Sequence, residues 1–286
     1  MEFWLVTTDH LSERILFRND EDYKVAMNYV AVVKHVTGVN ILAFILMSNH
    51  VHFVLECKEV KAYEFINRFK NLYGRYLRTR YGQKEMMRRI SVDVRPLRLE
   101  DESLKRAIAY VIMNSVDARL CLYANQYSWG SGAVYFCCRE PQGIVLGSFS
   151  KKAQRRLLLS HEVLNQNWLV LEDSYISPAS VVSFKFVESL YRSAGKMDYY
   201  LRTSSKAPTT AEQWDRTPSF SDQTLAAAVI DLKRSLFHKG DRDELTKEQW
   251  TGLARQLRRR FSMDINQLRR LTGLSNEEAV SIFDSF

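Results

Sequence analysis

Two of the six histidines in this 286-residue chain, His50 and His52, stand one residue apart in an otherwise apolar segment. In a β-strand, residues i and i+2 point to the same face, so the two imidazoles would lie side by side. Val51 and Phe53 would then point the other way, into the core. Adjacent imidazoles are good ligands for a divalent cation, so the spacing favours a metal site. The alternative interpretation is a pair of ordinary surface histidines.

A second pair, Tyr110 and Asn114, lies in a segment whose pattern predicts a helix over residues 103–122. Residues four apart share one face of a helix, about one turn from each other. The amide oxygen of Asn114 is a hard ligand that suits Mg²⁺ or Mn²⁺, and the Tyr110 hydroxyl would lie near the same ion. Alternatively, Tyr110 belongs to an apolar helix face with Ala107 and Val111, and Asn114 is a polar neighbour.

The elements that must position these residues follow from local patterns of β-formers, helical spacing and capping residues. The predicted order is strand 3–8, helix 21–37, strands 40–46 and 50–56, helix 61–81, strand 90–96 and helix 103–122. A β-α-β-β-α-β order is typical of ferredoxin-like domains. We therefore predict the α+β class, with a ferredoxin-like antiparallel sheet that carries its helices on one face.

The pattern changes after the glycine- and serine-containing segment 128–132. Helices are predicted at 151–160, 178–195 and 197–202, followed by a linker rich in Ser, Thr and Pro at 203–218. Three or four further helices are expected over residues 221–286. The chain is therefore divided into an α+β domain at 1–137, a helical extension at 138–205 and a helical C-terminal domain at 206–286.

Composition limits the class of protein. Hydrophobic residues make up 46% and charged residues 26% of the chain, as in ordinary globular proteins. The longest apolar run, Ile41–Met47, is far shorter than the roughly 20 residues that span a bilayer. The start of the chain lacks the features of a signal peptide, and the four cysteines form no CxxC pair. We therefore expect a cytoplasmic protein with reduced thiols and no membrane partner.

A basic surplus points to a polyanionic partner. Lys and Arg number 41 against 33 acidic residues, a formal net charge of +8, and such a surplus attracts nucleic acids. Aromatic and basic residues alternate along helix 61–81, which suits stacking on unpaired bases and contact with phosphates. The phosphate contacts predicted on this helix are Arg75, Arg78 and Arg80. The alternative is that many of these aromatics face the sheet as core.

The end of the chain has features of a helix-turn-helix. Gly273 separates two helical stretches and Ser275 is a good N-cap for the second. The arginines predicted to contact DNA in this region are Arg258, Arg259 and Arg269. Glu277 and Glu278 would open the recognition helix facing phosphates, which is unfavourable, so a helical bundle that packs on the rest of the chain is the alternative.

Three segments together resemble a known family: LAFILMSNHVHFVLE at 42–56, AIAYVIMNSVDARL at 107–120 and YSWGS at 127–131. They are similar to the REP-associated tyrosine transposases and the wider insertion-sequence-type single-tyrosine transposases, within the HUH endonucleases. The resemblance covers about residues 3–135 and implies a ferredoxin-like fold. It departs from the family at Ser115, where a proline is usual, and at Ser131 beyond Gly130, where Ser-Ser is preferred.

The resemblance assigns a role to each candidate residue. It implies that His50, His52 and Asn114 hold Mg²⁺ or Mn²⁺ and that Tyr110 is the nucleophile. The implied activity is cleavage and rejoining of single-stranded, hairpin-forming, repeat-associated DNA through a 5′-phosphotyrosine, by a nucleoid-associated monomer or homodimer. Two alternatives remain: a non-catalytic nucleic-acid-binding protein that retains the fold, and a metal-dependent phosphodiesterase in which water attacks.

Overall fold

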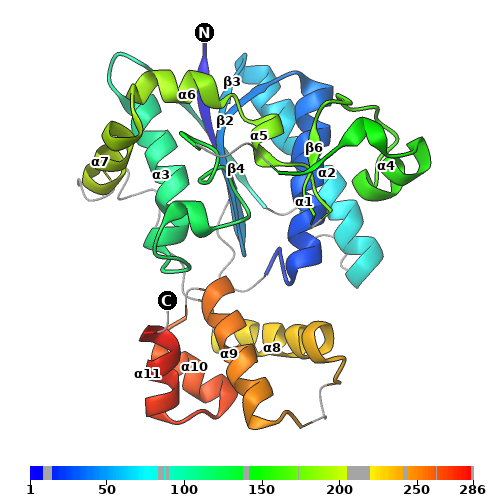
Figure 1. Cartoon of the computed structure of the whole chain (residues 1–286), viewed down its shortest axis with the longest axis vertical. Helices are drawn as coiled ribbons and strands as arrows, with labels where there is room; N and C mark the ends of the chain where they lie inside the picture. Colours follow the sequence, from blue (N-terminus) through cyan, green and yellow to red (C-terminus); the bar gives the residue numbers. More distant parts are fainter. Residues whose placement is uncertain are drawn as a thin grey trace.

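The computed structural model describes residues 1–8, 15–82, 87, 90–137, 142–172, 174–204, 220–240, 244–261 and 263–284. Its N-terminal half is built on a four-stranded antiparallel sheet with the order β2-β3-β1-β4 (Figure 1). The strands are β1 (Phe3–Thr8), β2 (Asn40–Met47), β3 (His50–Glu56) and β4 (Val92–Leu97). Their bounds lie within two residues of those predicted from the sequence.

Three helices connect and follow these strands: α1 (Asp20–Thr37), α2 (Glu59–Tyr81) and α3 (Ser103–Asp117). The element order and the strand order are those of a ferredoxin-like unit, which confirms the predicted α+β class. Gly38 and Gly82 end α1 and α2 in the left-handed conformation, with φ of 69° and 68°. Helix α3 is five residues shorter than predicted, because Arg119 adopts a left-handed φ of 57° and turns the chain away.

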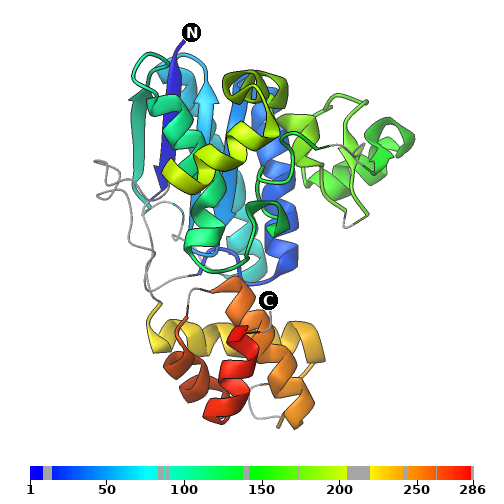
Figure 2. The ribbon, with the colours of Figure 1, turned by 60° about the vertical axis from the view of Figure 1, so that its left-hand side comes forward.

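The prediction that all helices lie on one face of the sheet is wrong. Helices α1 and α2 cover one face, whereas α3 covers the other (Figures 1 and 2). Strands β2 and β3 are apolar on both sides: Phe44 and Phe53 face α1 and α2, and Ile45 and Val54 face α3. Because both faces are apolar, both must be covered to remove them from water.

Residues 142–204 pack on both sides of this unit. They form the short elements β5 (Ile144–Val145), α4 (Lys151–Leu158), β6 (Leu169–Val170), α5 (Pro178–Val181), α6 (Phe184–Tyr191) and α7 (Ala194–Ser204). Leu158 joins the α1 and α2 core, whereas Tyr191 and Met197 join the α3 core. The helix predicted over 178–195 is interrupted, because Val182 is extended and forms a parallel bridge with Ile41.

The described part of residues 220–284 holds four helices, as the sequence predicted: α8 (Asp222–Phe237), α9 (Lys247–Arg260), α10 (Ile265–Thr272) and α11 (Asn276–Asp284). They surround a separate apolar core that includes Leu232, Leu257 and Phe261. We call this unit the C-terminal bundle, and it lies at one end of the sheet (Figure 2). Of the predicted linker at 203–218, residues 205–218 lie outside the described residues, and the three-part division of the chain stays a prediction.

The C-terminal bundle is joined to the rest of the protein by several contacts. Ile15 inserts into the core of the bundle. Arg18 pairs with Asp231 of α8 at 3.2 Å, and Asp20 pairs with Arg260 of α9 at 2.8 Å. Within the described ranges, no helix combines the length and hydropathy needed to cross a membrane.

Candidate catalytic site on the α3 face of the sheet

His50 and His52 point to the α3 face of β3, on the same side as Val54, while Val51 and Phe53 point into the core under α1 and α2. Each histidine is only 1% exposed. The interpretation of two surface histidines is therefore wrong. The two rings lie with their centroids 4.6 Å apart and nearly perpendicular, so their nitrogen atoms share one small volume.

The backbone around the histidines is fixed by neighbouring segments. The Val51 amide donates to the Thr8 hydroxyl at 3.0 Å, which ties the start of β3 to the end of β1. In the turn before β3, the Ser48 carbonyl accepts from the amides of Leu16 and Phe17 at 2.8 and 3.2 Å. The Asn49 side-chain oxygen lies 2.7 Å from Nδ1 of His50. These bonds set the direction in which the His50 ring points.

Helix α3 brings the second pair to the same place. The ring of Tyr110 stands edge-on to that of His52, with centroids 5.2 Å apart. The Asn114 amide nitrogen lies 3.5 Å from Nε2 of His52, and Asn114 is 8% exposed. Tyr110 is half-buried and also packs against the apolar cluster of α3, so both sequence interpretations describe part of its environment. Residues about 60 positions apart in the chain thus converge on one point.

The donor set at this point fits a divalent cation. Both imidazoles are buried, their centroids lie 4.6 Å apart, and neutral imidazole nitrogens are good ligands for divalent cations. The third protein ligand would be the Asn114 amide, which lies 3.5 Å from Nε2 of His52 and whose O and N assignment can be exchanged. Two imidazoles and one amide oxygen leave further positions for water or phosphate oxygens.

The YSWGS segment has a structural role at the edge of the sheet. The Tyr127 hydroxyl donates to the Leu46 carbonyl at 2.8 Å, and burial raises its pKa well above the ordinary value. Ser131 bonds the backbone of Phe44 through both its amide and its hydroxyl. A Cβ at Gly130 would stand 2.9 Å from the Phe44 carbonyl, which explains a glycine here. The segment therefore pairs with β2 along the edge of the sheet that does not contact β3.

The arginines predicted on α2 differ in their surroundings. Arg75 and Arg78 are exposed, as phosphate contacts must be. Arg80 instead lies 3.6 Å from the Asp22 carboxylate and donates to the Tyr76 hydroxyl. The aromatics of α2 that face the sheet are Phe65, Phe69 and Tyr73, all fully buried. The alternative interpretation of those aromatics as core is thus confirmed for these three residues.

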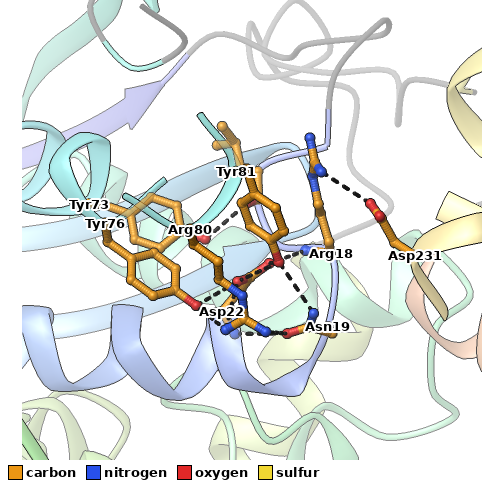
Figure 3. Close-up of polar contacts among 9 residues, drawn as sticks. Arg18, Asn19, Asp22, Tyr73, Tyr76, Arg80, Tyr81 and Asp231 are labelled. Carbon is orange, nitrogen blue, oxygen red and sulfur yellow. Dashed lines mark hydrogen bonds and ion pairs between the residues drawn. The ribbon is translucent and has the colours of Figure 1, made fainter. Parts of the chain in front are cut away.

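Asp22 is the centre of a buried polar cluster that the sequence did not reveal (Figure 3). It is 0% exposed and accepts from the Arg18 amide at 2.8 Å, from the Tyr76 hydroxyl at 2.7 Å and from the Tyr81 hydroxyl at 3.0 Å. Burial and the Asp22 charge raise the pKa of both tyrosines, which keeps them protonated as donors. The cluster joins the first turn of α1 to the last turns of α2.

The three C-terminal arginines predicted to contact DNA also differ in their exposure. Arg259 and Arg269 are exposed. Arg258 is 5% exposed, donates to the Arg119 carbonyl and stacks on the Phe283 ring, so its predicted role as a DNA contact is wrong. Its apolar neighbours lie on α9 and α11, which sequence spacing alone does not show.

Helices α10 and α11 have the order of a helix-turn-helix, with Gly273 in the left-handed conformation between them. However, α11 begins with two glutamates, Glu277 and Glu278. Lys247 hydrogen-bonds Glu278 at 2.6 Å and, with Ser275, lowers the pKa of that carboxyl to about 2. The start of α11 therefore carries negative charge at neutral pH and is unfavourable for contact with phosphates.

Comparison with known proteins gives a family match over the segment that contains the two histidines. Residues 10–90 match the family described as "Transposase IS200 like". A solved structure described as "Structure of the REP associates tyrosine transposase bound to a REP hairpin" aligns with a TM-score of 0.35 and 13% identity, over 49% of this chain and 86% of that chain. None of the curated proteins matches. The family match includes His50 and His52 and ends before Tyr110 and Asn114.

Proposed function

We propose that this chain, which carries an IS200-like transposase segment at residues 10–90, cleaves and rejoins single-stranded DNA with Tyr110 as the nucleophile. One observation carries the proposal: Tyr110 and Asn114 of α3 both lie against His52, with ring centroids 5.2 Å apart for Tyr110 and His52, and His52 is itself beside His50. The family match supports only the histidine half. The tyrosine half rests on this geometry and on the AIAYVIMN pattern of α3.

Tyr110 is well placed for attack on a phosphate held by the histidines. In the proposed step, the Tyr110 phenol gives up its proton as its oxygen bonds to phosphorus, the bond from phosphorus to the 3′-oxygen breaks, and the leaving oxygen takes up one proton as a 3′-hydroxyl. The 5′-phosphate stays on the tyrosine as a phosphodiester. A second 3′-hydroxyl reverses the step and joins strands, so no external energy source is needed.

His50, His52 and Asn114 are the residues that would hold Mg²⁺ or Mn²⁺. When bound, the cation supplies charge neutralisation and orientation at a non-bridging phosphate oxygen. The protein's own part is to keep both imidazoles buried and to orient the His50 ring through Asn49. Burial of the site also removes water that would compete with Tyr110.

The test is a denaturing gel of the full chain incubated with end-labelled DNA hairpins and Mn²⁺ or Mg²⁺. We expect a covalent protein–DNA band that requires the metal and disappears in Tyr110→Phe. The matched control is Tyr199→Phe, because Tyr199 is an exposed tyrosine of α7 outside the site. Cleavage without a covalent band, retained in Tyr110→Phe, would favour attack by water. Binding without cleavage on every hairpin would favour a non-catalytic DNA-binding protein.

A further inference from the structure

The C-terminal bundle docks next to the turn that leads into His50. The Ser48 carbonyl, two residues before His50, accepts from the amides of Leu16 and Phe17. Ile15, directly before them, inserts into the bundle core, and Arg18, directly after them, pairs with Asp231. One short segment thus contacts the bundle and the histidine turn at once. Residues 15–18 therefore join the bundle to the turn that leads into His50.

Such a surface exists as a cleft of about 500 Å³. Its walls are the last turns of α9, the first turns of α1 and the loop at 120–129 that follows α3. That loop begins six residues after Asn114, and its YSWGS part runs along the edge of β2. We call this space the interdomain cleft. Helix α9 reaches the sheet-bearing half of the protein through Arg258 and Arg260 (Figures 1 and 2).

The charge of the interdomain cleft favours an anion. Among the described residues that line it are the cations Lys24, Arg259 and Arg260 and one carboxylate, Asp20, so these residues carry a net charge of about +2. Asp20 is paired with Arg260 at 2.8 Å. Arg259 is exposed on the same helix turn and lines the cleft. Phosphate groups of nucleic acid are the anions that such a surface attracts.

The remaining lining suits a single strand more than a duplex. Amide groups of Gln126 and Gln256 stand beside the cations, whereas the Trp129 ring is stacked on Tyr23. Amides bond the sugars and base edges of unpaired nucleotides. Duplex DNA is recognised by a protruding helix or ribbon that enters a groove, whereas a concave site of this size takes a short stretch of unpaired nucleotides.

We propose that the interdomain cleft binds single-stranded DNA next to the cleaved phosphate, with Arg259 contacting the phosphate backbone. This inference rests on the proposed function and extends it to the C-terminal bundle, which lies outside the family match. The bundle then contributes through the end of α9, and the acidic start of α11 needs no contact with DNA. The C-terminal bundle and the ferredoxin-like unit form one substrate surface.

The experiment measures binding of a fluorescein-labelled oligothymidylate to the full chain by anisotropy, with EDTA present so that no cleavage occurs. Loss of one phosphate contact lowers the slope of log K against log salt by about 0.7, or roughly fourfold in affinity at 0.15 M salt. We expect this change in Arg259→Ala and its recovery in Arg259→Lys, which restores the positive charge. The control is Arg255→Ala, one turn earlier on α9, because Arg255 is exposed and outside the cleft lining. Arg269→Ala on α10, also outside the cleft lining, tests the helix-turn-helix as the competing DNA surface.

The outcomes separate this inference from the proposed function. If Arg259→Ala binds like the unmodified chain, the cleft is not a DNA surface, whether or not the Tyr110 adduct forms. Loss of affinity in Arg269→Ala alone would assign DNA binding to the helix-turn-helix instead. If Arg259→Ala weakens binding and no hairpin gives a covalent adduct, the result supports the cleft as a DNA-binding surface. The same result contradicts Tyr110 as the nucleophile. If the unmodified chain binds no oligothymidylate, the proposal that the interdomain cleft binds single-stranded DNA is wrong.

Discussion

The two faces of β3 are made from alternate residues of one strand, yet they have opposite characters around Phe53 and His52. On the α1 and α2 face, Phe53 contacts the rings of Phe44, Phe65 and Phe69 in a dry aromatic core. On the α3 face, the neighbouring His52 meets Tyr110 and Asn114. The difference teaches that the apolar face stabilises the folded state, whereas the other face holds polar groups that stability alone does not require.

The largest expected effect separates the two faces by stability. Phe53→Ala deletes a fully buried ring and should lower the free energy of unfolding by about 3–5 kcal/mol. His52→Ala, one residue away, should lower it much less but abolish metal-dependent formation of the covalent adduct. Urea unfolding and the denaturing gel measure the two quantities. A large loss of stability in His52→Ala would contradict the division between the faces.

Binding of a cation should act on the α3 face alone. Mg²⁺ or Mn²⁺ at a hundred times its dissociation constant should raise the free energy of unfolding by about 2.7 kcal/mol, because only the folded chain brings the ligands together. Thermal unfolding with and without the metal measures this gain. His50→Ala should remove it, while His161→Ala, a histidine outside the site, should keep it. An equal gain in His50→Ala would place the cation elsewhere.

Polar groups on the α1 and α2 side should behave as structure. Asp22→Asn keeps the shape of the side chain but replaces a charged acceptor of three short hydrogen bonds with an amide. We expect a loss of about 2 kcal/mol in the free energy of unfolding, with adduct formation per folded molecule unchanged. A selective loss of adduct in Asp22→Asn would show that this cluster also positions the catalytic face.

The sequence was informative where a residue's neighbours lie within one element. Strand alternation placed His50 and His52 on one face, and helical spacing placed Tyr110 beside Asn114. The sequence did not predict that helices cover both faces of the sheet, because an apolar run such as β2 does not indicate whether one or both faces are covered. Asp22 in its cluster and Arg258 at the Arg119 carbonyl were missed for another reason: their partners come from distant segments.

The smallest expected effect concerns the contact between the two units. Arg18 and Asp231 form an ion pair whose side chains are 19% and 21% exposed, so water still reaches it and a double-mutant cycle with Arg18→Ala and Asp231→Asn should give a coupling of about 1 kcal/mol in urea unfolding. Arg18 also lies over the Tyr81 ring, and the cycle removes that contribution from the coupling.

The same pair predicts a dependence on pH. Burial raises the pKa of Asp231 more than Arg18 lowers it, so the folded carboxyl holds its proton more tightly than the unfolded one. Its contribution to stability is therefore present at low pH and is lost as the pH rises through the folded pKa. Asp231→Asn should flatten that part of the stability profile, measured by urea unfolding across the acidic range. A steeper dependence of stability on pH in Asp231→Asn would contradict the raised pKa of Asp231. A coupling of several kcal/mol in the double-mutant cycle would mean that this ion pair stabilises the docked bundle as strongly as a core contact does.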